Sequence, residues 1–213
     1  MKYDFHSHSK YSSDGFPDPK KIVKTAVKRG LSGIAITDHN TIKGGIEAKK
    51  YETDEFKVVV GSEIKTDRGE VIGLFLCDEI RSRVFHEVVD EIRNQNGIVV
   101  VPHPFDRLRG KALYPSEDET KLIDNMEVFN SRCMLNRYNE KAAEFARTNN
   151  LKIIAGSDAH FLSEIGNGGV ITESEDIHEA VKKGDFTVFG QKSHITNLGL
   201  SELLSGWRML KGN

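Results

Sequence analysis

The stretch 33-GIAITDH-39 decides how this chain folds, because a short apolar run is followed at once by Asp38 and His39. A short run of this kind, rich in β-branched residues, indicates a buried strand. The same order, a strand-like run and then His, Asp or Glu, recurs along the chain. The repeats are Tyr3–Phe5 before His6 and His8, Lys57–Gly61 before Glu63, Ile98–Val101 before His103, and Ile153–Ala155 before Asp158 and His160. The sequence therefore predicts a sheet whose strands end in chemically active side chains.

Amphipathic helices are predicted between the strands. Helical periodicity is present in Pro19–Arg29, Val84–Asn94 and Leu135–Thr148, and further strand-like runs are Val71–Leu76, Met126–Phe129 and Thr187–Phe189. This alternation indicates an α/β fold with a mainly parallel sheet, interrupted by a hairpin at Asp67-Arg68-Gly69. Periodicity alone does not separate a closed α/β barrel from an open doubly wound sheet.

The polar residues at the strand ends form a plausible ligand set for metal ions. In parallel α/β folds these ends open on one face, so residues far apart in sequence converge there. Side chains two apart in an extended segment point the same way, as in His6 and His8 or Asp158 and His160. His with Asp or Glu suits zinc, manganese or iron, and five histidines with at least three carboxylates exceed the needs of one ion. Two or three divalent ions are expected.

Each of these residues also has a purely structural interpretation. A lone His-x-His pair is weak evidence, His39 could cap a helix over Thr41–Lys50, His103 could pack in a turn, and Asp158 could be an N-cap. The joint occurrence of five histidines in four strand-end segments favours the metal site. The other three histidines, His86, His178 and His194, are expected at the surface, and Cys77 in the core.

Composition narrows the classes of protein. The 213 residues suit one domain, and a net charge of −2, from 30 basic and 32 acidic side chains, argues against a surface that wraps polyanions. The sequence shows neither a signal peptide nor an apolar run long enough to span a membrane. Cys77 and Cys133 are far apart and outside any CxxC motif, so a reducing cytoplasm is the expected location.

Five short motifs, taken together, resemble the polymerase and histidinol phosphatase (PHP) superfamily, most closely its short metal-dependent phosphoesterases. They are HSHSKYSSDG at 6–15, ITDHNT at 36–41, GSEI at 61–64, PHP at 102–104 and GSDAH at 156–160, and the resemblance covers positions 3 to about 166. It implies a distorted (β/α)7-type barrel with a trinuclear site at the carboxyl ends of the strands. The whole chain, 1–213, would be one PHP domain, with about 172–213 as a C-terminal extension packed on the barrel.

The resemblance also implies roles for individual ligands. His6 and His8 would bind one ion together with Asp158, Glu63 would bridge, and His103 would bind the second ion. Asp14, His39 and His160 would form the third set.

Three positions depart from the commonest pattern of the family. Where many members have a histidine after the GxE motif, this chain has Glu70, which is either an oxygen ligand favouring manganese or an exposed hairpin residue. Cys133 is either a thiolate ligand for zinc or iron or a buried free thiol. Asn40 stands where related proteins often carry Asp.

The function implied is hydrolysis of a phosphomonoester or nucleotide by hydroxide formed on ions about 3.5–4 Å apart. His8, His160 or the third ion would assist the leaving oxygen, and Asp38 would orient His39 or another ligand. Arginine matches phosphate with a planar fork, so Arg107, Arg109 and Arg132 are candidate substrate-binding residues, with Lys65 a weaker one.

Three other functions stay open on the sequence. They are exonuclease-like action on a short RNA or DNA end, amidohydrolase-type hydrolysis of a non-phosphate bond, and a non-catalytic metal-binding module. The apolar stripe Leu198, Leu200, Leu203, Leu204 and Trp207 is expected to pack on the domain rather than on a partner, and the oligomeric state is left open.

Overall fold

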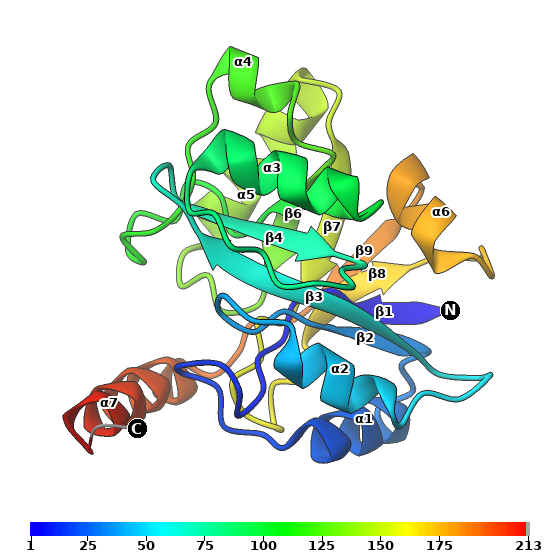
Figure 1. Cartoon of the computed structure of the whole chain (residues 1–213), viewed down its shortest axis with the longest axis vertical. Coiled ribbons are helices and arrows are strands. Elements are labelled where there is room, and N and C mark those ends of the chain that lie inside the picture. Colours follow the sequence, from blue (N-terminus) through cyan, green and yellow to red (C-terminus); the bar gives the residue numbers. More distant parts are fainter. Residues whose placement is uncertain (212–213) are drawn as a thin grey trace.

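A computed structural model of the chain describes residues 1–211, which contain nine strands and seven helices (Figure 1). The strands are β1 (Lys2–Asp4), β2 (Gly33–Ile36), β3 (Lys57–Lys65), β4 (Glu70–Leu74), β5 (Ile98–Val101), β6 (Asn125–Asn130), β7 (Lys152–Gly156), β8 (Gly168–Ile171) and β9 (Thr187–Gly190). The helices are α1 (Pro19–Lys28), α2 (Lys43–Lys49), α3 (Phe85–Asn94), α4 (Glu117–Thr120), α5 (Asn136–Thr148), α6 (Ile177–Lys183) and α7 (Ile195–Lys211).

All nine strands belong to one sheet in the order β7-β6-β5-β4-β3-β2-β1-β8-β9. The pairs β1–β2, β2–β3, β5–β6 and β6–β7 are parallel, whereas β3–β4, β4–β5, β1–β8 and β8–β9 are antiparallel. The prediction of a mainly parallel sheet is therefore wrong. The predicted hairpin is present and reverses β4, and a second antiparallel pair closes the far edge of the sheet.

The sheet curls into a distorted, nearly closed barrel, which confirms the predicted fold class. Beyond β1 the chain runs alongside β7 and the residues that follow it. Asp158 N donates to His6 O at 2.7 Å, and His8 N donates to Ala159 O at 2.8 Å. These bonds join the two segments that carry His6, His8, Asp158 and His160, so barrel closure itself brings together residues 150 positions apart.

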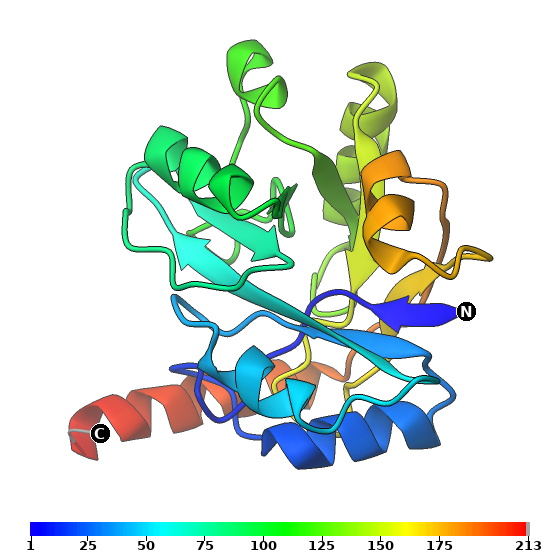
Figure 2. The same cartoon turned by 45° about the vertical axis from the view of Figure 1, so that its right-hand side comes forward.

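The helices cover the outside of the barrel and fix it by apolar burial. Asp18 caps α1 by accepting from Lys20 N, and the next residue is Pro19, whose fixed φ suits a first helical turn. One face of α3 buries Phe85, Val88, Val89 and Ile92 against the sheet. In Figures 1 and 2, α1 and α2 lie on one side of the sheet, and α3 and α5 on another.

Two differences from the predicted elements concern the site directly. β3 continues past Gly61 to Lys65, so Glu63 lies inside a strand, and β4 begins with Glu70. The short strand β8 was not predicted, because its first two residues are glycines, which are poor strand formers. Gly169 is required there, since a Cβ would clash with the carbonyl oxygen of Tyr3.

Helix α7 leaves the barrel and extends toward the C-terminus (Figure 2). Leu200 and Leu203 are 46% and 74% exposed, so the prediction that they pack on the domain is wrong. The side chain of Trp207 and residues 212–213 of the predicted C-terminal extension lie outside the described residues. Within residues 1–211, no helix is both long and apolar enough to cross a membrane.

Candidate metal centre

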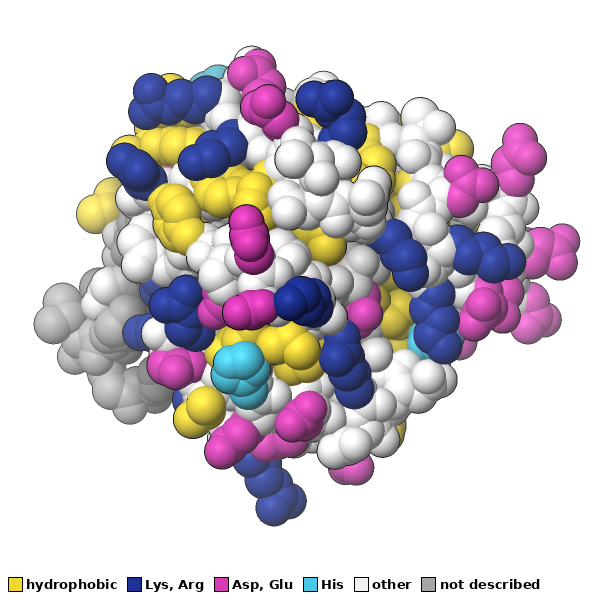
Figure 3. All heavy atoms as spheres, turned by 90° about the horizontal axis from the view of Figure 1, so that it is seen from above, with side chains coloured by type: hydrophobic (Ala, Val, Ile, Leu, Met, Phe, Trp, Pro, Cys, Tyr) yellow, Lys and Arg dark blue, Asp and Glu magenta, His cyan; other side chains and the backbone are white. Residues whose placement is uncertain are grey.

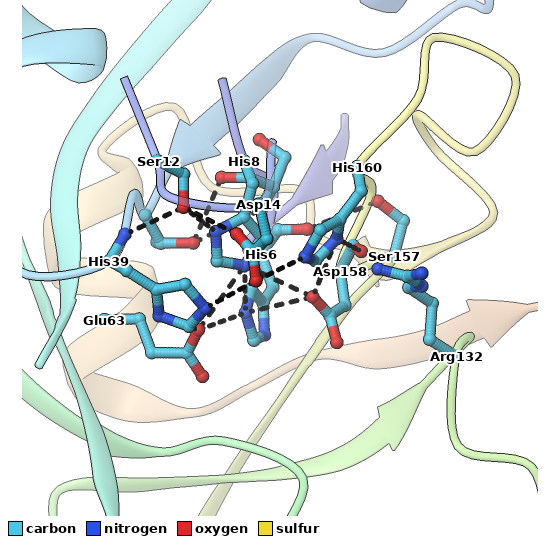
Figure 4. Close-up of polar contacts among 12 residues, drawn as sticks. His6, His8, Ser12, Asp14, His39, Glu63, Arg132, Ser157, Asp158 and His160 are labelled. Carbon is cyan, nitrogen blue, oxygen red and sulfur yellow. Dashed lines mark hydrogen bonds and ion pairs between the residues drawn. The ribbon is translucent and has the colours of Figure 1, made fainter. Parts of the chain in front are cut away.

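The predicted ligands meet at one rim of the barrel (Figure 4). His6 and His8 follow β1, His39 follows β2, His103 follows β5, and Asp158 and His160 follow β7. Because β4 runs antiparallel to β3, its first residue, Glu70, rather than its last, lies at the same rim. Eight of the predicted ligands fall into four groups of three, and within each group the ligand atoms lie within 4.8 Å of one another. The groups are His6, His8 and Asp158; His6, Glu63 and His103; His8, His39 and Glu63; and His8, Asp14 and His160.

His6 and His8 turn their Nε2 atoms toward each other at 3.1 Å. The Nδ1 atom of His6 donates a hydrogen bond to Glu127 Oε1 at 3.0 Å. The hydroxyl of Ser12 donates to Asp14 at 2.8 Å and so accepts from Nδ1 of His8 at 3.2 Å. Both outer nitrogens thus carry the ring proton, and both Nε2 lone pairs face one point. Two lone pairs at this distance repel unless a cation lies between them, so the pair fits a metal ion.

Asp158 supports the same conclusion. Its Oδ1 atom lies 3.5 Å from Nε2 of His6 and 3.2 Å from Nε2 of His8. That oxygen is buried and makes no hydrogen bond among the described residues. A buried carboxylate oxygen without a donor is costly, and a bound cation would satisfy it.

Glu63 has the geometry of a bridging carboxylate. Its Oε1 atom lies 2.9 Å from Nε2 of His103, whereas Oε2 lies 3.3 Å from Nδ1 of His39 and 3.4 Å from Nε2 of His8. The two oxygens therefore face different groups of ligands. The third predicted set is also assembled, because Oδ2 of Asp14 lies 3.0 Å from Nε2 of His39 and 3.2 Å from Nε2 of His160.

The electrostatics of the rim favour bound positive charge. Burial opposes protonation of His6, yet the carboxylates of Asp158, Glu127 and Glu63 outweigh it and raise its pKa well above the ordinary value. Burial likewise opposes protonation of His39, but Glu63 and Asp14 raise its pKa to about 9. Burial also disfavours the charged form of Glu63, and its histidine neighbours nevertheless hold its pKa well below the usual range. Divalent cations would supply the same positive charge.

The backbone is strained at two of the ligands. His103 has φ of 29° and Asp158 has φ of 55°, a region that non-glycine residues seldom adopt. Such strain costs about 1–3 kcal/mol per residue and clusters at functional sites. Asn40 has φ of 57°, which asparagine tolerates, and its Oδ1 atom accepts from Lys65 N at 3.1 Å. It therefore shapes the backbone next to His39.

Glu70 and Cys133, the two departures from the family pattern, differ in their surroundings. Glu70 is 4% exposed, so the expectation of an exposed hairpin residue is wrong, and its carboxylate lies 3.8 Å from Nε2 of His103. Cys133 packs with Phe105 and Tyr138 outside the four ligand groups, and burial raises the pKa of its thiol. Both ligand roles stay predictions, and the geometry favours Glu70 over Cys133. Cys77 was expected in the core and is exposed.

Asp38 is buried at the rim, but its carboxylate does not orient His39. Its two oxygens accept from the backbone N and the hydroxyl of Ser9, at 2.5 and 2.7 Å. Asp38 therefore stabilises the turn that follows His8. Of the two expected roles, orienting His39 or orienting another ligand, the first is not made by a hydrogen bond, and the second stays a prediction because Ser9 directly follows His8.

A cavity of about 690 Å³ lies over the ligand cluster. Arg109 and Arg132 line it, whereas Arg107 and Lys65 are exposed and are not among the lining residues. The guanidinium of Arg109 lies 2.5 Å from Asp158 Oδ2, and that of Arg132 lies 2.5 Å from Ser201 Oγ and 3.5 Å from Glu164. Both arginines are thus already engaged with protein groups.

Sequence reasoning missed three residues of the site. Glu127 holds His6, accepts from His103 N at 2.6 Å, and accepts from Asn130 at 3.0 Å. Lys111 lines the cavity, with its Nζ 3.5 Å from Glu70. Asp4 accepts from the backbone of His6, Ser157 and Gly166 and so fixes two ligand-bearing segments. For Asp4 and Glu127 the sequence did carry a signal, because each is an acidic residue inside a strand-like run, at 3–5 and at 126–129.

The chain is similar to several known proteins. The family described as PHP-associated matches residues 136–186. The uncharacterized protein MJ1587 of Methanocaldococcus jannaschii is 44% identical over 146 residues, which are 62% of this chain and 82% of that protein. The 5'-3' exoribonuclease of Haemophilus influenzae is 37% identical over 78 residues, 34% of this chain and 28% of the enzyme.

A solved structure has the same fold. It is a two-domain protein from Bacteroides vulgatus that contains a predicted PHP-like metal-dependent phosphoesterase, and it matches with a TM-score of 0.75 at 21% identity. The match covers 90% of this chain, which spans 65% of the length of that protein. The chain belongs to the PHP superfamily, as its motifs predicted.

Proposed function

We propose that this chain is a metal-dependent phosphoesterase that acts on small phosphomonoesters, nucleotides included. The observation that carries the proposal is the convergence of eight His, Asp and Glu side chains beneath a cavity that also holds Arg109 and Lys111. Such a site offers His, Asp and Glu ligands to metal ions, and the positively charged side chains of Arg109 and Lys111 to a phosphate group. The PHP-like phosphoesterase named in the Bacteroides structure supports the same class of reaction.

Two or three divalent ions, manganese, zinc or iron, would be held by the four ligand groups, with Glu63 shared between sets. Bound there, they supply a water of lowered pKa and positive charge for the phosphoryl oxygens. The mixture of imidazole and carboxylate ligands does not select one of these metals. The cytoplasmic location remains a prediction from the two free thiols.

The chain's own residues would bind the substrate and handle protons. Lys111 is half-exposed to the cavity and is the cation best placed to meet a phosphate, because Arg109 is engaged by Asp158. Among His8, His160 and Asp38, the residue that lines the cavity is His160. Its Nδ1 donates to the carbonyl of Asp158 at 2.8 Å, which leaves Nε2 free to hold a proton near Asp14. We therefore assign proton donation to the leaving oxygen to Nε2 of His160 in the form that binds two ions and leaves the group of His8, Asp14 and His160 empty; with a third ion bound there, Nε2 would be a ligand and would donate no proton.

Action on short nucleic-acid ends is the second candidate function, because the Haemophilus relative is named as an exoribonuclease. Basic and acidic side chains are interspersed on the face shown in Figure 3, and the chain as a whole has a net charge of −2, whereas proteins that bind long nucleic acids usually have a basic excess. A small substrate, or the last nucleotide of a chain, is therefore favoured over bound polynucleotide.

The test is a screen of manganese-loaded protein against phosphomonoesters, phosphodiesters, short oligonucleotides and amides. We expect phosphate release from monoesters, abolished in His103→Ala and retained in His86→Ala, since His86 is exposed and belongs neither to the four ligand groups nor to the residues that line the cavity. Hydrolysis of amides alone, or equal activity in the two variants, would overturn the proposal. Metal analysis of the same samples checks the ligand set, with fewer than two ions per parent chain contradicting a cluster.

A further inference from the structure

Part of the lining of the cavity over the metal centre is apolar, and this part is called the wall. Its residues, Leu108, Met134, Ile195 and Leu198, come from three separate parts of the chain: the loop after β5, the turn after β6, and the first turns of α7. Leu108, Met134 and Ile195 are 58%, 47% and 62% exposed, which is unusual for large apolar side chains. Exposed apolar side chains that gather in one place mark binding surfaces more often than scattered ones do.

Helix α7 turns a defined face toward this cavity. Ile195, Leu198 and Gly199 are spaced by three and four residues and lie on one side of the helix, whereas Leu200 and Leu203 do not line the cavity. Gly199 leaves open space on the cavity side, since a Cβ built there meets no atom within 4 Å. A larger side chain can therefore be introduced at Gly199, which lines the cavity, without a clash at its Cβ.

A buried connection holds this face in place. Arg132, 4% exposed, donates to Ser201 Oγ at 2.5 Å and to the carbonyl of Asn197 at 3.3 Å. The same guanidinium lies 3.5 Å from Glu164, which accepts from the backbone N of His160 at 3.0 Å. The start of α7 is thus positioned relative to the metal centre through Arg132, while the rest of the helix extends away (Figures 1 and 2).

We infer that this wall, defined as Leu108, Met134, Ile195, Leu198 and Gly199, determines specificity by binding an apolar or aromatic group attached to the phosphate. The inference rests on the proposed function and narrows its substrate class. The same cavity is lined by ligands of the candidate metal centre and by Lys111 and Arg109, so one ligand would meet cations at its phosphate and hydrocarbon at its other end. A cavity of about 690 Å³ lies within the range that holds a compact organic ligand. Polyol phosphates would leave their hydroxyl groups unpaired against this wall.

The test compares two unreactive anions on manganese-loaded protein, phenylphosphonate and methylphosphonate, by titration calorimetry. They share the phosphonate and differ in the ring, so the ratio of their dissociation constants reports on the wall alone. Burial of a phenyl ring predicts tighter binding of phenylphosphonate by about 10-fold to 100-fold.

Gly199→Leu is the informative variant, because it places a large side chain in the cavity without a clash at the Cβ. It also replaces a helical glycine, so the helix itself is not weakened. We expect it to reduce the preference for phenylphosphonate to less than about threefold. Gly206→Leu is the matched control, since it makes the same change on the same helix, also in open space, away from the lining residues. Ile195→Ser is a second variant that removes an exposed apolar side chain and leaves the core unchanged.

Equal binding of the two phosphonates by the parent, or equal preferences in Gly199→Leu and Gly206→Leu, would overturn the inference and leave the phosphoesterase proposal intact. Binding of neither anion by the metal-loaded parent would contradict both. The same ratio, measured as kcat/KM for phenyl phosphate against glycerol phosphate, is expected to follow the binding ratio.

Discussion

The floor and the wall of the central cavity are built in opposite ways. The floor consists of the buried ligand groups, of which Glu63, His103 and Asp158 line the cavity and are each 2% exposed or less. The wall consists of exposed apolar groups, of which Leu108 and Ile195 are more than half exposed. Both invert the ordinary distribution, in which charge is outside and apolar side chains are inside.

The floor and the wall are held in position by different interactions. The ligands of the floor are held by barrel strands, and His6 and His8 are also fixed by the hydrogen bonds that they donate to Glu127, Asp4 and Ser12. The wall depends on one helix, one loop and the guanidinium of Arg132. We therefore expect the floor to be rigid and intolerant of substitution, and the wall to vary with the substrate.

The largest effect is expected from Glu63→Gln, which breaks the floor at the carboxylate that two ligand groups share. Glutamine removes the negative charge between His103 and His39, so metal binding should fall sharply. Substitution of a residue that only hydrogen-bonds to a metal ligand typically lowers metal affinity or activity by about 10-fold to 100-fold. Because Glu63 is itself a predicted ligand, we expect the rate of phosphate release to fall by more than about 100-fold. The measurements are metal content and kcat/KM; Glu55→Gln, at an exposed position, is the control. An unchanged metal content would show that Glu63 is not a ligand.

A smaller effect is expected from Glu127→Gln, which leaves the ligands in place and weakens their support. The amide still accepts from Nδ1 of His6, but the negative charge that raises the pKa of that imidazole is lost. We expect metal affinity to fall about 10-fold to 100-fold, measured by competition with a chelator. Glu144→Gln, exposed on α5, should bind metal as the parent does. Identical affinities in the two variants would remove Glu127 from the site.

Ser201→Ala is expected to loosen the α7 part of the wall and to leave the metal ligands of the floor unchanged. It removes the hydroxyl that accepts from Arg132, a hydrogen bond to a charged group worth about 1.5–3 kcal/mol. Amide hydrogen exchange over residues 195–201 should therefore accelerate by about 10-fold or more, with metal content unchanged. Thr196→Ala, at an exposed position on the same helix, is the control. Loss of metal in Ser201→Ala would mean that wall and floor are not independent.

The smallest effect is expected from Cys133→Ser. Cys133 packs with Phe105 and Tyr138 rather than in a ligand group, so the number of bound ions should stay as in the parent. Cys77→Ser, at the exposed cysteine, is the reference for any general effect of losing a thiol. Loss of one ion in Cys133→Ser alone would restore the thiolate ligand that the sequence suggested.

The floor could be predicted closely from sequence, for a simple geometric reason. Its residues lie within two or three positions of short apolar strands, and strands of one barrel bring such positions to one rim. Where the prediction failed, side-chain direction was responsible. Asp38 precedes His39 in sequence but turns to Ser9, and Glu70 is buried because β4 runs back from the rim.

The wall could not be predicted, because its members carry no local signal. Leu108 and Met134 lie in segments without regular periodicity, and the apolar stripe of α7 looks like a helix that packs on a core. Which side of α7 faces the cavity depends on the contact of Ser201 with Arg132, 69 residues earlier. Lys111 was missed for the same reason, since a lysine in a loop gives no indication of what it faces.

The sequence by itself determined the class of fold, the family and most of the ligands, because strand patterns and short motifs are local. Only the tertiary structure decided that half of the strand pairs are antiparallel, that Glu127 accepts a hydrogen bond from His6, and that apolar side chains from three parts of the chain line the same cavity as the ligands. Those features depend on how distant segments pack against each other, and packing of this kind leaves no pattern in the order of residues.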